Sequence, residues 1–168
     1  MTDFDSYTAS YERHRQTVNR ANELNKAIVF DALTTAGITD ITVTFDGYGD
    51  SGQIEGITAH IGETPKALPA PPATGPLPET QPEAAVPLPE TRLTIHQAQW
   101  NSDEVGLRET TLQDAIEELC YGYLEQEHGG WEINDGSYGA FRFDVAARAI
   151  HLEFNGRFTD VATSHHAF

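Results

Sequence analysis

The sequence lacks the features that secreted, membrane-spanning and disulfide-linked proteins usually carry. Its 168 residues include one cysteine, Cys120, so no internal disulfide can form, as expected in a reducing compartment. No apolar run approaches the roughly 18 residues that a membrane-spanning helix needs. The first residues are acidic and do not resemble a signal peptide. These absences predict a cytoplasmic protein.

Basic residues are scarce. Ten Lys and Arg residues stand against 26 Asp and Glu residues, which gives a formal net charge of −16. Such a chain repels nucleic acid and anionic membranes, and it attracts basic surfaces such as those of nucleic-acid-binding proteins. High acidic charge also serves solubility alone. We therefore expect no direct binding to nucleic acid or membranes, and a basic protein surface as the partner if there is one.

Proline is absent from most of the chain, because all nine prolines lie between Pro65 and Pro89. Residues 63–92 are therefore predicted to form a linker or insertion of polyproline character. Residues 1–62 are predicted to form an N-terminal helix-hairpin half, and residues 93–168 a C-terminal half with a helix and a β-meander. We expect the halves to form one composite domain, with two separate lobes as the alternative.

The first half contains one helical and two strand patterns. Apolar residues at helical spacing, with Leu24 and Ile28 among them, predict a helix over residues 12–36. Alternation predicts strands over residues 41–45 and 53–61, separated by a glycine-rich turn. The alternation in the second strand changes phase at Gly56, which predicts a β-bulge there.

The second half begins with a possible strand over residues 93–100, followed by a polar, acidic segment over 101–109. Apolar residues from Leu112 to Leu124 recur at helical spacing, and Thr111 with Asp114 approximates a capping box. Further alternation predicts strands over residues 131–133, 141–143 and 150–154. Asn155-Gly156 indicates a hairpin turn that leads to a last strand over residues 158–161.

Each half thus reads as a helix followed by two strands. The sequence predicts an α+β fold with an antiparallel sheet of about five to six strands. Two main helices pack on one face of this sheet, and the Pro-rich insertion lies between the two α-β-β halves.

Two segments, residues 45–55 and 116–141, resemble a family of small acidic bacterial proteins of unknown function associated with plasmids and mobile elements. The resemblance rests on motifs such as Asp46-Gly47-Tyr48-Gly49 and His128-Gly129-Gly130-Trp131. It covers both halves and skips the Pro-rich segment. It implies a mobile-element context and transfers no catalytic residue.

The first of these segments also offers acids for a metal site. Asp46, Asp50 and Glu55 lie in a glycine-rich loop, and Asp135 would join them if its turn lies beside this loop. The spacing does not fit an EF-hand. The alternative is a hairpin turn whose acids bond to backbone amides. A divalent cation is therefore the one cofactor considered, for a metal-binding module or a metal-dependent enzyme.

Other catalytic signatures are missing. The seven histidines form no zinc-binding pattern, and no P-loop, dinucleotide or serine-hydrolase motif occurs. Cys120 lies in an apolar helical stripe, which favours a core position over a nucleophile. The sequence therefore favours a non-enzymatic protein.

The second helix offers the best interaction surface. No lysine or arginine occurs from residue 109 to 141, so we expect its acids to be unpaired. These acids are the predicted partner-binding residues: Asp114, Glu117, Glu118, Glu125 and Glu127. The sequence therefore suggests an acidic inhibitor or nucleic-acid mimic that binds a basic protein surface. A structural accessory domain without a partner is a further alternative.

Overall fold

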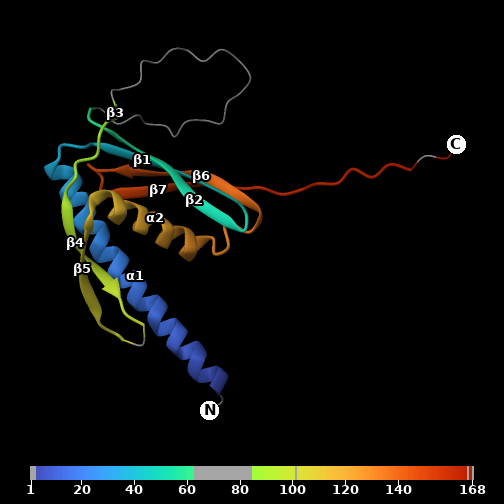
Figure 1. The fold of residues 1–168 in the computed structure, drawn as a ribbon, viewed down its shortest axis with the longest axis horizontal. Coiled ribbons are helices and arrows are strands. Elements are labelled where there is room, and N and C mark those ends of the chain that lie inside the picture. Colours follow the sequence, from blue (N-terminus) through green and yellow to red (C-terminus); the bar gives the residue numbers. More distant parts are fainter. Residues whose placement is uncertain (1–2, 63–84, 101, 166, 168) are drawn as a thin grey trace.

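The computed structural model describes residues 3–62, 85–100, 102–165 and 167, with side chains from residue 6 onward. Two helices lie on one side of a five-stranded antiparallel sheet, and a separate two-stranded hairpin lies along the first helix (Figure 1). The α+β prediction is confirmed. The elements in chain order are α1 (Asp3–Thr35), β1 (Asp40–Gly49), β2 (Ser51–His60), β3 (Ala85–Val86), β4 (Arg92–Ala98), β5 (Val105–Thr111), α2 (Leu112–Glu127), β6 (Asn134–Asp144) and β7 (Ala149–Gly156).

The sheet order is β3-β2-β1-β6-β7, so β1 of the first half and β6 of the second half pair at its centre. Val43 lies opposite Phe141 in this central pair. The halves α1-β1-β2 and α2-β6-β7 thus share one sheet and one core. Residues 63–84 of the predicted linker lie outside the described residues. Ala85–Val86 pair with the end of β2.

The core lies between the sheet and the two helices. Alternate residues of β1 and β6 face the helices and are buried, while Thr42 and Thr44 face the other side. The predicted bulge is confirmed: Thr44 pairs with Gly56 and Phe45 with Ile54, which leaves Glu55 as the extra residue. The bulge keeps both ends of β2 in phase with the core, because Ile54 and Ile57 both pack against it.

Helix α2 matches its prediction closely. The Thr111 side chain accepts a hydrogen bond of 3.1 Å from the Asp114 amide, as expected of an N-cap. The predicted stripe is buried, and its buried members are Leu112, Ala115, Ile116, Leu119, Cys120 and Leu124. Neither described helix is long and apolar enough to cross a membrane.

Helix α1 differs from its prediction in length and in orientation. It begins at Asp3 rather than near residue 12, and its N-terminal half extends beyond the sheet, beside β4 and β5 (Figure 1). Leu24 is 41% exposed, whereas Asn25 is 7% exposed. Asn25 is buried because its side chain pairs with the backbone of β4. It donates to the His96 carbonyl at 2.8 Å and accepts from the His96 amide at 2.7 Å.

One strand was missed, and two strand predictions were wrong. Strand β5 occupies much of the segment read as polar, since its pairing with β4 stabilises a sequence with few apolar residues. Residues 131–133 form a turn, because Gly130 adopts a φ of +79° and redirects the chain after α2. Asn155-Gly156 form no hairpin turn, because both residues belong to β7 and pair with β6. Residues 158–161 form no returning strand, because the bonds from Asp135 to Thr159 keep the chain in line with β7.

Replacing Asn25 by alanine should destabilise the fold by about 2–3 kcal/mol, since it leaves two groups of the His96 backbone without partners. Urea unfolding measures this. Asn22→Ala is the matched control one turn earlier. The Asn22 Nδ2 has no hydrogen-bond partner among the described residues, so its loss should cost much less. Equal effects of the two variants would contradict this role for Asn25.

Candidate functional site

The two glycine-rich segments that the resemblance singles out meet in space. Trp131, in the turn after α2, lies against Gly47 of β1 and Gly52 of β2, which form a cross-strand pair. A Cβ atom on Gly52 would lie 2.3 Å from the indole, and one on Gly47 would lie 2.8 Å from it. Only glycine leaves room for the indole at these two positions. Trp131 is 8% exposed and packs edge-on against Phe45 at 5.5 Å.

A third glycine, Gly136, lets the backbone of β6 lie close to the backbone of β1. Gly136 has a φ of +69°, and a Cβ atom there would lie 1.9 Å from the Gly47 carbonyl oxygen. The Ser137 hydroxyl donates to the Trp131 carbonyl at 2.7 Å and fixes the turn. The two motifs therefore form one packed unit, the glycine–tryptophan cluster, which consists of Gly47, Gly52, Trp131, Gly136 and Ser137.

Arg157 binds the backbone of two cluster residues and the side chain of the neighbouring Asp46. Its guanidinium donates to both carboxylate oxygens of Asp46, at 3.0 and 2.8 Å, and to the carbonyls of Gly47 and Ser137. It also lies over the Tyr138 ring, 4.7 Å from the centroid. The Asp46 hydrogen bond raises the pKa of Arg157 further above its ordinary value. Asp46 is thus an ion-pair partner inside the fold.

The four acids of the predicted metal site are engaged elsewhere or lie apart. Asp46 binds Arg157, and Asp135 accepts hydrogen bonds from the Thr159 amide and hydroxyl at 2.6 and 2.9 Å. Asp50 is exposed in the tight turn, and Glu55 accepts from Gln53 at the bulge. Within the described ranges, no three His, Cys, Asp or Glu side chains gather as a possible ligand set.

The glycine–tryptophan cluster borders an open hollow of about 370 Å³ between the end of α2 and the end of β7. The His128 ring stacks on Phe154 with centroids 3.6 Å apart and forms part of the wall. Close by in the chain, the Glu132 Oε2 is buried and has no hydrogen-bond partner among the described residues.

The acidic face of α2 is exposed, but it is not wholly without counter-charge. Arg108 of β5 forms an ion pair with Glu118, so the expectation that all five acids are unpaired was wrong for this one. Arg108 lies just before the segment without bases, residues 109–141. Helical spacing within α2 could not pair it with Glu118, because Arg108 belongs to a strand. Glu117 accepts a hydrogen bond from Gln113 at 3.0 Å, and Gln126 donates to Glu127. Asp114 and Glu125 have no ion pair within the described part of the chain.

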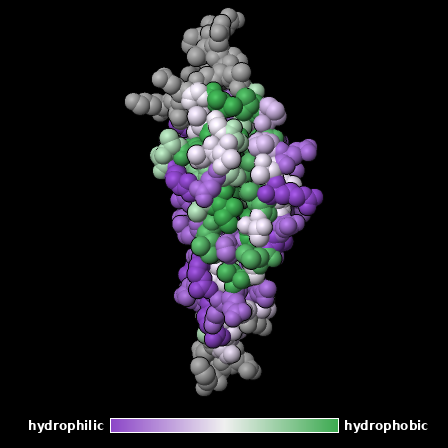
Figure 2. Space-filling view, turned by 90° about the vertical axis from the view of Figure 1, so that its left-hand side faces the viewer, coloured by the Kyte–Doolittle hydropathy of each residue, from purple (hydrophilic) through white to green (hydrophobic). Residues whose placement is uncertain are grey.

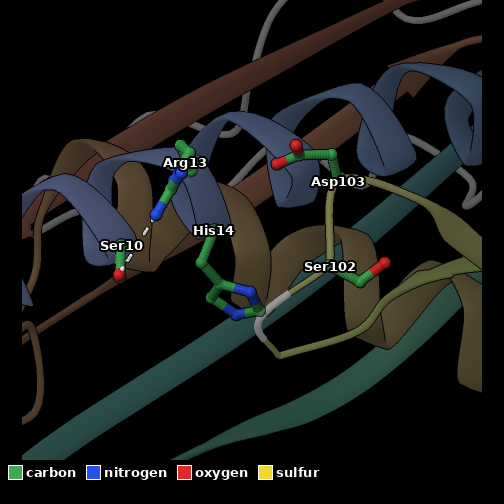
Figure 3. A pocket seen from close by; sticks show the side chains of 5 residues that line it. All are labelled: Ser10, Arg13, His14, Ser102 and Asp103. Atoms are coloured by element: carbon green, nitrogen blue, oxygen red, sulfur yellow. Dashed lines mark hydrogen bonds between the residues drawn. The ribbon is translucent and has the colours of Figure 1, made fainter.

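A pocket that no sequence motif indicated lies near the tip of the β4–β5 hairpin. Ser10, Arg13 and His14 of α1 and Ser102 and Asp103 of the hairpin loop line a cavity of about 280 Å³ (Figure 3). Arg13 donates to the Ser10 hydroxyl at 3.3 Å.

The His14 ring packs edge-on against Trp100 at 4.7 Å. Its Nδ1 is buried and has no hydrogen-bond partner among the described residues. Arg13 is the base that lines this pocket, and it stands in the sequence close to Arg15 and Arg20.

Cys120 is fully buried in the core, and burial raises the pKa of its thiol above the ordinary value. Because the thiolate is the reactive form, the structure gives this cysteine no nucleophilic role. A thiol reagent at pH 8 should therefore label Cys120 only as fast as the protein unfolds. Labelling at the rate of a free thiol in native buffer would contradict its burial.

Replacing Gly52 by alanine should destabilise the protein by about 3 kcal/mol, because the new methyl group overlaps the Trp131 indole. Gly56→Ala on the same strand is the control. A Cβ atom there would have its nearest neighbour at 3.8 Å, so the cost should stay below about 1 kcal/mol. Urea unfolding of both variants tests the contact, and equal stabilities would refute it.

Comparison with known protein families yields a match over most of the chain. Residues 21–74 and 77–168 match a family of unknown function, DUF6878. The matched ranges contain both motifs of the glycine–tryptophan cluster, together with all of α2 and the sheet. Neither the curated proteins nor the solved structures give a significant match. With most of its length covered by the match, the chain belongs to the DUF6878 family of unknown function.

Proposed function

We propose that this protein is a non-enzymatic interaction protein whose acidic α2 face binds a basic protein surface. The observation that carries the proposal is the set of five carboxylates on α2, of which Glu117 is half-buried and the others are exposed. Among the described residues, Arg108 is the one ion-pair partner of these acids. Like charges on one helix face repel each other, and a basic partner relieves that repulsion. The formal charge of −16 adds long-range attraction to such a partner.

The density of these charges approaches that of nucleic acid. At 1.5 Å per residue, the five acids from Asp114 to Glu127 span about 20 Å of the helix axis, with a gap of about 10 Å between Glu118 and Glu125. Phosphates along one DNA strand are separated by about 3.4 Å of helix axis. A protein that binds DNA through lysine and arginine is therefore the partner class we propose. A cytoplasmic inhibitor of a host nucleic-acid-binding protein, carried by a mobile element, is the fullest form of this proposal.

The motif residues support a non-catalytic function. Asp46 and Asp135 bind Arg157 and Thr159, and the glycines accommodate Trp131, so packing accounts for these residues without any chemistry. The same observations favour the simpler alternative of a structural accessory domain. The two proposals differ in one respect, which is whether the carboxylates of α2 contribute to binding.

The proposal predicts a salt-sensitive partner. The tagged protein is used to capture host proteins at low salt, and a salt gradient then elutes them for mass spectrometry. We expect a basic nucleic-acid-binding protein that elutes at high salt and that duplex DNA displaces in competition. If no basic protein is retained, or if DNA binds the partner together with this protein, the mimic proposal fails.

The double variant Glu117→Lys/Glu125→Lys tests the surface itself. It leaves intact the Glu118–Arg108 ion pair and the acid at the helix N-terminus. We expect binding to the captured partner to weaken at least about tenfold at low salt. Asp50→Lys/Glu55→Lys is the matched control, since it changes the net charge equally at two exposed positions of the β1–β2 hairpin. Equal losses in both double variants would mean that total charge, not the α2 face, determines binding.

A further inference from the structure

Strand β7 is an open edge of the five-stranded sheet. It pairs with β6 on one side and has no strand on its other side within the described residues. The opposite edge differs, because β3 has two residues and β2 carries the bulge at Glu55. Sheets usually protect their edges with proline, lysine, bulges or short strands. The eight residues of β7 contain no proline or lysine and keep a regular register with β6.

The chain after β7 does not return to cover this edge. The Arg157 amide donates to the Gly136 carbonyl at 2.9 Å, and Asp135 binds the Thr159 amide and hydroxyl. These bonds keep residues 157–159 in line with β7. The chain then runs outward past the sheet as an extended segment (Figure 1). This segment carries Phe158, 84% exposed, and Val161, 76% exposed.

Side chains alternate along the open strand in a way that favours pairing with a copy of itself. Ile150, Leu152 and Phe154 are partly buried and pack against the core. His151 and Glu153 lie on the other face, with an imidazole donor two residues from a carboxylate acceptor. An antiparallel pair of identical strands brings such residues together twice, through two-fold symmetry.

We propose that β7 is a self-association surface, which pairs antiparallel with β7 of a second copy and joins the two sheets. The pairing is centred on Leu152, which lies opposite Leu152 of the second copy. His151 then faces Glu153 of the second copy, and Ile150 faces Phe154 of the second copy. Each of these two contacts occurs twice, with apolar pairs on the core face and polar pairs on the other.

The neighbouring registers are less favourable. Centring the pair on His151 places two histidines opposite each other and leaves Glu153 opposite Ala149. Centring it on Glu153 places two carboxylates opposite each other, which is destabilising. A shift by a single residue in the pairing mixes the apolar and polar faces. The register centred on Leu152 is therefore the one that satisfies both faces.

Self-association has a salt dependence opposite to that of the proposed partner binding. Each copy carries −16, so the two copies repel each other at low salt, and added salt screens this repulsion. Binding to a basic partner weakens with salt. The two activities also use different elements, β7 and α2, so either one can fail without the other.

Sedimentation equilibrium of the full chain over a range of concentrations tests the proposal. We expect a reversible dimer of the 18.5 kDa chain that tightens between 50 and about 300 mM salt. His151→Glu places like charges opposite each other twice and should weaken the dimer at least about tenfold.

The charge-swapped variant His151→Glu/Glu153→Lys is the decisive control. It restores two opposite-charge pairs in the register centred on Leu152 and in neither neighbouring register, so the dissociation constant should return to within about threefold of the original. Circular dichroism verifies that each variant is folded. A chain that stays monomeric at millimolar concentration overturns the proposal. So does a dimer that His151→Glu leaves unchanged or that the swap fails to restore.

Discussion

The packing of the Trp131 indole on the Gly47–Gly52 pair is the contact on which the arrangement of this protein depends. It joins the turn after α2, in the second half of the chain, to the β1–β2 hairpin of the first half. Because the indole occupies the space of two absent side chains, neither half can form this surface alone. The residues of this junction lie within the ranges that match the DUF6878 family, whose function is unknown.

The junction also determines which surfaces stay open. Arg157, held by Asp46 and by the carbonyls of Gly47 and Ser137, keeps the chain after β7 in line with the sheet edge. The described residues leave the edge of β7 uncovered as a result, while α2 carries most of its carboxylates on the side opposite its buried stripe. On the side of the molecule where β4 and β5 lie, an apolar stripe runs between hydrophilic borders (Figure 2). Leu107 of β5, 68% exposed, is an exposed apolar residue of that hairpin.

Sequence reasoning predicted the elements whose signal is local. The stripe and cap of α2 and the bulge at Glu55 follow from side-chain periodicity and were found. Sequence reasoning failed where a contact with a residue far along the chain determines the burial or the ion pair of a side chain. Asn25 is buried through two bonds to a residue 71 positions away, and Arg108 neutralises Glu118 from a neighbouring strand. For the same reason the four candidate metal acids could be named but not placed, since the partner of Asp46 lies 111 residues further along.

A double-mutant cycle between Gly52 and Trp131 tests the central contact most directly. Gly52→Ala, Trp131→Leu and the double variant are compared with the original chain by urea unfolding. The account predicts strong coupling: alanine at position 52 destabilises the chain when the indole is present and is nearly neutral when leucine replaces it. If alanine costs the same free energy in both backgrounds, the glycine is required for a reason other than the indole. The junction between the two halves would then need a different explanation.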